Sequence, residues 1–237
     1  MNRRAFHTLA AFNLGLPLFA RAAYADETER RIGRHGERSV DEPRAASEAE
    51  QILARVEAFY QKVTTFETSF RQYFSRGPYS PTPSMGSLFF ERPAKLSFRF
   101  ANGDRVVADS AQIQVYQKQS KQMFVQNARA SQLPLMLSFL TAQGRLAEMF
   151  EFTKRAPRAA TPVSSHVLIG KPLQPSAICE FLSLDIDIRT DEVRRVTVGA
   201  PRGTRVRYDF GVSVRNARIP LGEFELRPPP GTSMVHA

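Results

Sequence analysis

Apolar residues recur every three or four positions between Ser47 and Thr64, which is the spacing that gives a helix one buried face. These apolar positions are Ile52, Leu53, Val56, Phe59, Tyr60 and Val63. Ser47 is followed three residues later by Glu50, the pattern of a capping box in which each side chain bonds the other residue's backbone N–H. The pattern therefore predicts an amphipathic helix that begins immediately after Ser47.

After this helix the period changes to two, and such alternation predicts β-strands with one buried face. In the first segment, 66–74, phenylalanines alternate with polar or charged residues. Similar short segments recur as far as 223–227, separated by polar turns such as Asn102-Gly103, a strong hairpin signal. A stretch rich in Pro, Ser and Gly at 77–86 predicts a long loop. Together the segments predict an antiparallel meander of roughly ten or eleven short strands with two or three helices.

One segment, 132–142, interrupts the strand pattern. Its sequence, QLPLMLSFLTA, leaves almost no polar face for a helix to turn toward water. We therefore expect a helix here that is covered on more than one side.

The first 46 residues differ in composition from the rest of the chain. Residues 1–25 have the pattern of a cleaved export signal: two arginines, a short apolar run, and Ala-Tyr-Ala before an acidic stretch. The start also resembles a twin-arginine signal, but His7 stands where that motif has an apolar residue, so we favour the Sec route. Residues 26–46 are mostly charged and predict a flexible lead-in. Residues 47–237 remain as a single domain of a protein that we expect in the periplasm.

The charge balance is strongly basic, with 33 Lys and Arg residues against 23 Asp and Glu residues and a formal net charge of +10. Such an excess is typical of nucleic-acid binders, but here the basic residues are scattered singly along strands. Three of the ten charges belong to the predicted signal, so the mature chain would carry +7. We therefore expect no nucleic-acid partner, and a surface that favours encounter with anionic headgroups or acidic membrane partners.

Few residues suggest a catalytic or metal site. Cys179 is the only cysteine, which excludes an intrachain disulfide and a thiolate-rich metal site, and its apolar neighbours predict a small buried residue. His166 is the only histidine inside the predicted fold, and a lone strand histidine is usually a surface or satisfied residue. Asp185 and Asp187 share a strand face, for which a solvated polar face is favoured over a catalytic pair. No hydrolase, zinc-protease or nucleotide-binding motif is present, so we expect no enzyme, no cofactor and no metal.

The sheet must cover an apolar face that is unusually rich in phenylalanine, since the chain has 18 Phe and no Trp. A closed barrel filled by its own side chains would cover that face. A curved half-barrel that leaves an apolar hollow for a ligand would do so as well. Composition alone does not choose between the two.

Several fragments, taken in order, give the chain a resemblance to a known family. They are Val63-Thr-Thr-Phe66-x-x-x-Phe70, Gly86-Ser-Leu88-Phe-Phe90-Glu-Arg92-Pro93 followed by Leu96 and Phe98, Val107-Ala-Asp109 followed by Val115-Tyr116, Pro134-Leu-Met136-Leu137, and Phe224-x-Leu226-x-Pro228-Pro229-x-Gly231. From Leu53 to Val235 their order and spacing resemble the periplasmic outer-membrane lipoprotein carrier family, LolA.

The resemblance implies a mainly β, α+β fold: an unclosed antiparallel β-barrel of about 11 strands with a helical lid over an apolar cavity. It also implies a carrier that takes the acyl chains of lipoproteins from an inner-membrane release transporter and delivers them to an outer-membrane lipoprotein receptor. We expect such a carrier to act as a monomer. Two alternatives with the same fold remain open: a carrier of another lipid, and an envelope sensor that binds lipid or protein and transfers nothing.

Strand parity and the resemblance together assign a lipid-binding site. The expected cavity-lining residues are Phe66, Phe70, Leu88, Phe90, Leu96, Phe98 and Phe100 from the strands, with Leu133, Met136, Leu137 and Leu140 from the lid. In the family, the arginine of the Arg-Pro pair donates hydrogen bonds to carbonyls of the lid helix and holds the empty cavity shut. The resemblance therefore implies that Arg92 is a lid latch that reaches the segment 135–140.

Overall fold

The structure, a computed structural model, describes residues 47–79, 83–128, 136–141, 146–156 and 164–236. The predicted export signal (1–25), the predicted lead-in (26–46) and Leu133 lie outside the described residues. The helical elements are α1 (Glu48–Gln61), α3 (Ser138–Thr141), α4 (Leu146–Met149) and the 3₁₀ turn η2 (Pro201–Gly203). The strands are β1 (Thr65–Arg76), β2 (Ser84–Glu91), β3 (Lys95–Phe100), β4 (Arg105–Ala108), β5 (Gln112–Gln117), β6 (Gln122–Asn127), β7 (Phe150–Arg155), β8 (Ser165–Pro172), β9 (Phe181–Asp187), β10 (Val193–Ala200), β11 (Thr204–Arg215) and β12 (Ser233–His236).

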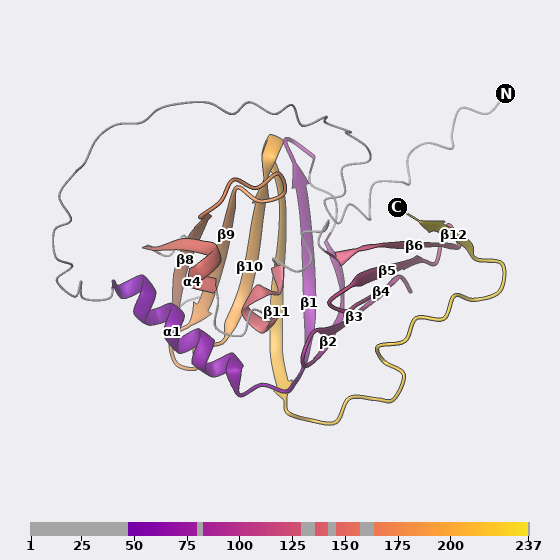
Figure 1. Cartoon of the computed structure of the whole chain (residues 1–237), viewed down its shortest axis with the longest axis horizontal. Coiled ribbons are helices and arrows are strands. Elements are labelled where there is room, and N and C mark those ends of the chain that lie inside the picture. Colours follow the sequence, from indigo (N-terminus) through magenta and orange to yellow (C-terminus); the bar gives the residue numbers. More distant parts are fainter. Residues whose placement is uncertain (1–46, 80–82, 129–135, 142–145, 157–163, 237) are drawn as a thin grey trace, which may run out of the picture.

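All of these strands belong to one 12-stranded sheet with the order β12-β6-β5-β4-β3-β2-β1-β11-β10-β9-β8-β7. Every neighbouring pair is antiparallel except β12, which pairs in parallel with β6. In Figure 1, β1 and β9–β11 run at a steep angle to β3–β6, so the sheet curves strongly around its concave face. Because β12 and β7 form two separate edges, the sheet does not close. The predicted mainly β, unclosed barrel is confirmed, with β12 as an additional short edge strand.

Helix α1 forms where the sequence predicts it. The Ser47 hydroxyl accepts a hydrogen bond from the Glu50 backbone, and the Glu50 carboxylate accepts one from the Ser47 backbone at 2.5 Å, which completes the capping box. The buried side of the helix consists of Ala49, Ile52, Leu53, Val56 and Tyr60. α1 therefore packs one apolar face on the concave side of the sheet and leaves its other face to solvent.

The strand predicted at 223–227 is wrong. Residues 217–232, which we call the C-terminal strap, contain no strand and run along the outer face of the sheet. The side chain of Glu223 is fully buried there, accepting a hydrogen bond from Ser97 at 2.7 Å and pairing with Arg99 and Arg105. Of the alternating residues at 223–227, Glu223 is buried, Phe224 and Leu226 are half-buried, and the other two are exposed, in a segment that contains no strand. The loop predicted at 77–86 is also too long, since β2 already begins at Ser84.

Asp185 lies on the outer face of β9, but it is only 5% exposed. Its carboxylate lies 3.5 Å from the guanidinium of Arg195 on the neighbouring strand, and burial raises the pKa of Asp185 despite that positive charge. The prediction that Asp185 belongs to a solvated polar face is therefore wrong. The outer face of this half of the sheet instead contains a covered ion pair.

Candidate functional site

The residues that parity assigned to a cavity lie on one face of the sheet. The antiparallel register pairs Phe66 with Phe90, and Leu88 with Phe98, so the inward side chains of β1, β2 and β3 form one continuous surface. Ten of the eleven predicted lining residues are described, each is at most 7% exposed, and all belong to one hydrophobic core. They are Phe66, Phe70, Leu88, Phe90, Leu96, Phe98, Phe100, Met136, Leu137 and Leu140. Leu133 lies outside the described residues.

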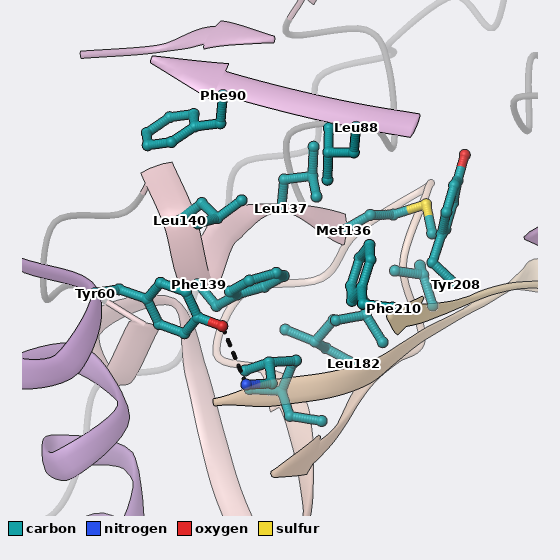
Figure 2. Close-up of a cluster of buried hydrophobic side chains, with 14 of the residues drawn as sticks. Tyr60, Leu88, Phe90, Met136, Leu137, Phe139, Leu140, Leu182, Tyr208 and Phe210 are labelled. Carbon is teal, nitrogen blue, oxygen red and sulfur yellow. Dashed lines mark hydrogen bonds between the residues drawn. The ribbon is translucent and has the colours of Figure 1, made fainter. Parts of the chain in front are cut away.

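Residues 136–141, which we call the lid segment, lie inside the curve of the sheet. Figure 2 shows the side chains of this segment between Leu88 and Phe90 of β2 on one side and strands β9 and β11 on the other. Met136, Leu137, Phe139 and Leu140 are each no more than 4% exposed. The expectation of a segment covered on more than one side is therefore confirmed for the described part. In this structure the lid's own side chains occupy the space next to the strands.

A continuous series of aromatic contacts connects α1, the lid segment and both halves of the sheet. The ring of Phe139 lies 4.9 Å from that of Tyr60 and 5.9 Å from that of Phe210, measured between centroids. Phe210 stacks on Tyr208 at 6.2 Å, and Tyr208 lies 5.5 Å from Phe70 on β1. Contacts of this kind add to the free energy gained by burial alone. Movement of the lid segment would therefore disturb the packing of α1 and of β11.

Four members of this site were not predicted from the sequence. Phe139 lies within the apolar run at 132–142 but was not assigned to the lining. Tyr208 and Phe210 lie at the alternate positions of β11 that face inward. Tyr60 lies at the three- or four-residue spacing of the buried face of α1. The same two periodicities that identified the other residues could have found these four.

Two tyrosine hydroxyls are fully enclosed in the interior. The Tyr60 hydroxyl accepts a hydrogen bond from the Val193 backbone N–H at 3.0 Å, drawn as the dashed line in Figure 2. The Tyr208 hydroxyl accepts one from the Gln72 amide at 2.7 Å. Burial raises the pKa of both tyrosines well above the ordinary value, so both remain neutral. The interior therefore contains polar atoms without carrying charge at these positions.

Arg92 holds the end of α1. Its Nε donates to the Val63 carbonyl and its Nη2 donates to the Tyr60 carbonyl, both at 2.6 Å. A cation is favoured at this position because carbonyls at a helix C-terminus carry partial negative charge. The guanidinium thus reaches the end of α1, and among the described residues it bonds none of 136–140, so the partner differs from the one that the resemblance implies. The reason is topological, since the Arg92 backbone N–H also bonds the Thr64 carbonyl, at the connection between α1 and β1.

The other residues considered for catalysis or metal binding are Cys179, His166 and groups of possible metal ligands. Cys179 is 3% exposed, as predicted, and burial raises the pKa of its thiol to about 11. His166 is partly exposed, and desolvation lowers its pKa. Within the described ranges, no three His, Cys, Asp or Glu side chains come together in a way that could hold a metal ion. None of the helices in the described part of the chain has the length and apolar character needed to cross a membrane.

Comparison with known proteins relates the chain to one sequence family. The family model described as "Outer membrane lipoprotein carrier protein LolA" matches residues 61–227, a span that contains Arg92 and the lid segment. No curated protein matches the chain.

Solved structures align with the chain at low sequence identity. An uncharacterized conserved protein from Thermus thermophilus aligns with a TM-score of 0.51 at 11% identity, covering 81% of this chain and 100% of that one. An outer membrane lipoprotein-sorting protein domain from Vibrio parahaemolyticus aligns with a TM-score of 0.43 at 9% identity, covering 74% and 95%. A chain of the Pseudomonas aeruginosa MucA/MucB complex aligns with a TM-score of 0.41 at 15% identity, covering 76% and 62%. The first of these supports the half-barrel architecture.

Proposed function

Because the chain belongs to the outer membrane lipoprotein carrier protein family LolA, we propose that it is a periplasmic carrier of lipoproteins. It shelters their acyl chains inside the half-barrel and moves them from the inner to the outer membrane. The observation that carries this proposal is the continuous apolar face of β1, β2 and β3, covered by a lid segment and set in a sheet with two unjoined edges. A sheet of this kind can widen to admit a ligand because no ring of hydrogen bonds has to break.

A carrier is needed because acyl chains leave a membrane at great cost. Moving one CH₂ group into water costs about 0.8 kcal/mol, so a chain of ~15 methylenes costs ~12 kcal/mol. At about 1.4 kcal/mol per factor of ten, free transfer through water is disfavoured by ~10⁸. Large, non-directional side chains such as Phe70 and Leu88 remove most of that cost without tight, specific contacts.

We assign the latch to Arg92 acting through α1. Arg92 fixes the last turn of the helix at the Tyr60 carbonyl, and the Tyr60 ring touches Phe139 of the lid segment. An acyl chain that enters the interior has to displace the lid side chains. It would thereby loosen the Tyr60 contact, and with it the hydrogen bonds from Arg92.

The partners and boundaries follow from the same proposal. Residues 1–25 would be removed on export through the Sec route, and 47–237 would form the carrier domain, active as a monomer. The donor would be an inner-membrane release transporter, and the acceptor an outer-membrane lipoprotein receptor. The family provides the basis for these partners.

The test is direct transfer of a lipoprotein. Purified protein is incubated with inner-membrane vesicles that contain the release transporter and a triacylated lipoprotein, and the soluble fraction is analysed by native mass spectrometry. A stoichiometric soluble complex that then gives up its lipoprotein to outer-membrane vesicles supports the carrier. Uptake of a different lipid, or of none together with capture of a protein, would replace this proposal with the other carrier or with a sensor. Val212→Arg, which changes an 86% exposed residue, is the control for Leu88→Arg, which changes a fully buried one.

A further inference from the structure

Five arginines lie in one half of the two longest strands and in the turn that adjoins it. They are Arg71 and Arg76 of β1, Arg202 of η2, and Arg205 and Arg207 of β11, which we together call the arginine tip. The register places Arg76 opposite Thr204, Ser75 opposite Arg205, Tyr73 opposite Arg207 and Arg71 opposite Asp209, so the four strand arginines lie within six successive rungs next to η2. Figure 1 shows this end of β1 and β11 at the top of the view, at the far end of β1 from α1.

The charge of the arginine tip is largely uncompensated. The nearest carboxylate is that of Asp209, which is opposite Arg71 in the register and which lies 2.6 Å from Arg195 and 3.2 Å from Arg207. The four arginines of the tip other than Arg207 are exposed and form no ion pair with any described residue. Glu180, an exposed carboxylate beside Gly199, balances one of these four charges at most. The tip therefore presents an excess of positive charge to solvent.

Aromatic rings accompany these arginines. The Arg207 guanidinium lies 3.8 Å from the centroid of the Tyr73 ring, and that of Arg205 lies 5.9 Å from Phe181. Tyr79 is 44% exposed and is joined to Arg76 by two backbone hydrogen bonds of 2.9 and 3.1 Å. Guanidinium groups bind phosphate oxygens in a bidentate manner, and tyrosine rings are enriched at the headgroup level of membranes. A cluster of arginines next to an exposed ring matches the chemistry of a phospholipid surface.

We propose that the arginine tip docks the protein on a membrane surface that contains anionic phospholipids. The guanidinium groups bind lipid phosphates, and the Tyr79 ring enters the headgroup layer beside them. Docking at this end leaves Arg92 and the end of α1, at the opposite end of β1, away from the contact. The surface is separate from the proposed interior site, so its test requires no cargo.

The first experiment is flotation of the cargo-free protein with vesicles of phosphatidylcholine alone or mixed with phosphatidylglycerol. We expect binding only to the mixed vesicles, weakening as salt rises because the charges are exposed. An arginine at an anionic surface contributes roughly five-fold to the partition coefficient, so Arg71→Glu/Arg76→Glu/Arg205→Glu should lower it by about 100-fold or more. The control, Arg189→Glu/Arg218→Glu/Arg227→Glu, changes the net charge equally at exposed positions outside the tip and should retain most of the binding.

A second measurement follows the tip directly and does not depend on the triple variant folding. The chain has no tryptophan, so Tyr79→Trp introduces a single fluorescent reporter at the tip. We expect its emission to shift to shorter wavelength on mixed vesicles, whereas Val212→Trp, an exposed position on β11 outside the tip, should not shift.

Three results would overturn the proposal: no binding of the unmodified protein to mixed vesicles, an equal loss of binding in both triple variants, or an unchanged Tyr79→Trp spectrum. An acidic protein surface would be the better partner if the tip bound one while ignoring the vesicles. Each of these failures leaves lipoprotein transfer, which is measured separately, unaffected.

Discussion

Replacing Arg92 by leucine removes both side-chain donors that fix the end of α1. The carbonyls of Tyr60 and Val63 then lose their guanidinium partner, while the introduced leucine side chain still fits at the end of β2. The change loosens the closed form, in which Tyr60 packs on Phe139, but it leaves the acyl-binding face intact. We expect Arg92→Leu to accept lipoprotein and then fail to pass it on.

The magnitude follows from the two hydrogen bonds. A hydrogen bond to a charged group contributes about 1.5–3 kcal/mol, and because Arg92 is only partly buried we take ~1.5 kcal/mol for the pair. That value lowers the ratio of closed to open protein by about ten-fold. Since acyl chains bind the open form, the apparent affinity for an acyl ligand should rise by about the same factor. Release to an acceptor should slow correspondingly.

The assay combines ligand binding with transfer. Titration with a fluorescent fatty acid should give a Kd for Arg92→Leu about ten times lower than for the unmodified protein. Arg92→Lys, whose ammonium group cannot present the same two-pronged geometry, should lie between the two. Arg189→Leu, at an exposed position, serves as the control. An unchanged Kd together with normal transfer to outer-membrane vesicles would refute the coupling of Arg92 to the lid.

Three further predictions concern stability and reactivity. Tyr60→Phe leaves the buried Val193 N–H without its acceptor and should lower the free energy of unfolding by ~1–3 kcal/mol in urea titrations; an unchanged value would contradict the role of this bond. Glu223→Ala leaves two arginines unpaired under the C-terminal strap and should make the strap sensitive to limited proteolysis, whereas continued resistance would show that other contacts hold it. Cys179, whose pKa is raised to about 11, should have roughly one thiolate per thousand molecules at pH 8 and should react with a thiol reagent only after unfolding; rapid reaction of the native protein would contradict its burial.

Local periodicity predicted those parts of the fold whose cause is local. α1 depends on its own apolar period and its own capping box, so Ser47 and the buried face could be placed from sequence. Features that depend on how distant strands and loops meet could not be predicted from local sequence. Asp185 pairs with Arg195 from a neighbouring strand, and Glu223 of the strap is buried because it bonds side chains of β3 and β4. β12 is only four residues long and pairs in parallel with β6, which local pattern does not indicate.

In the candidate site, too, features with a local cause could be predicted and features that depend on topology could not. Parity is a local property, and it placed the inward phenylalanines of β1, β2 and β3 on one buried face. The partner of Arg92 is a property of topology, because it depends on how the end of β2 meets the connection between α1 and β1. The sequence therefore identified the arginine but not the carbonyls that it binds.

A filled interior has a consequence for release of the proposed cargo. Closing the lid buries Met136, Leu137, Phe139 and Leu140, and each such side chain contributes about 1.5–3 kcal/mol, or ~6–12 kcal/mol together. Sheltering one acyl chain of ~15 methylenes contributes ~12 kcal/mol. For one acyl chain, the closed empty form and the loaded form therefore differ by only a few kcal/mol, because the lid side chains and that chain compete for the same apolar surface. A permanently open cavity would have no such competitor and would retain its cargo with the full hydrophobic free energy. The lid that fills the interior is thus what allows an acceptor with modest affinity for acyl chains to take them.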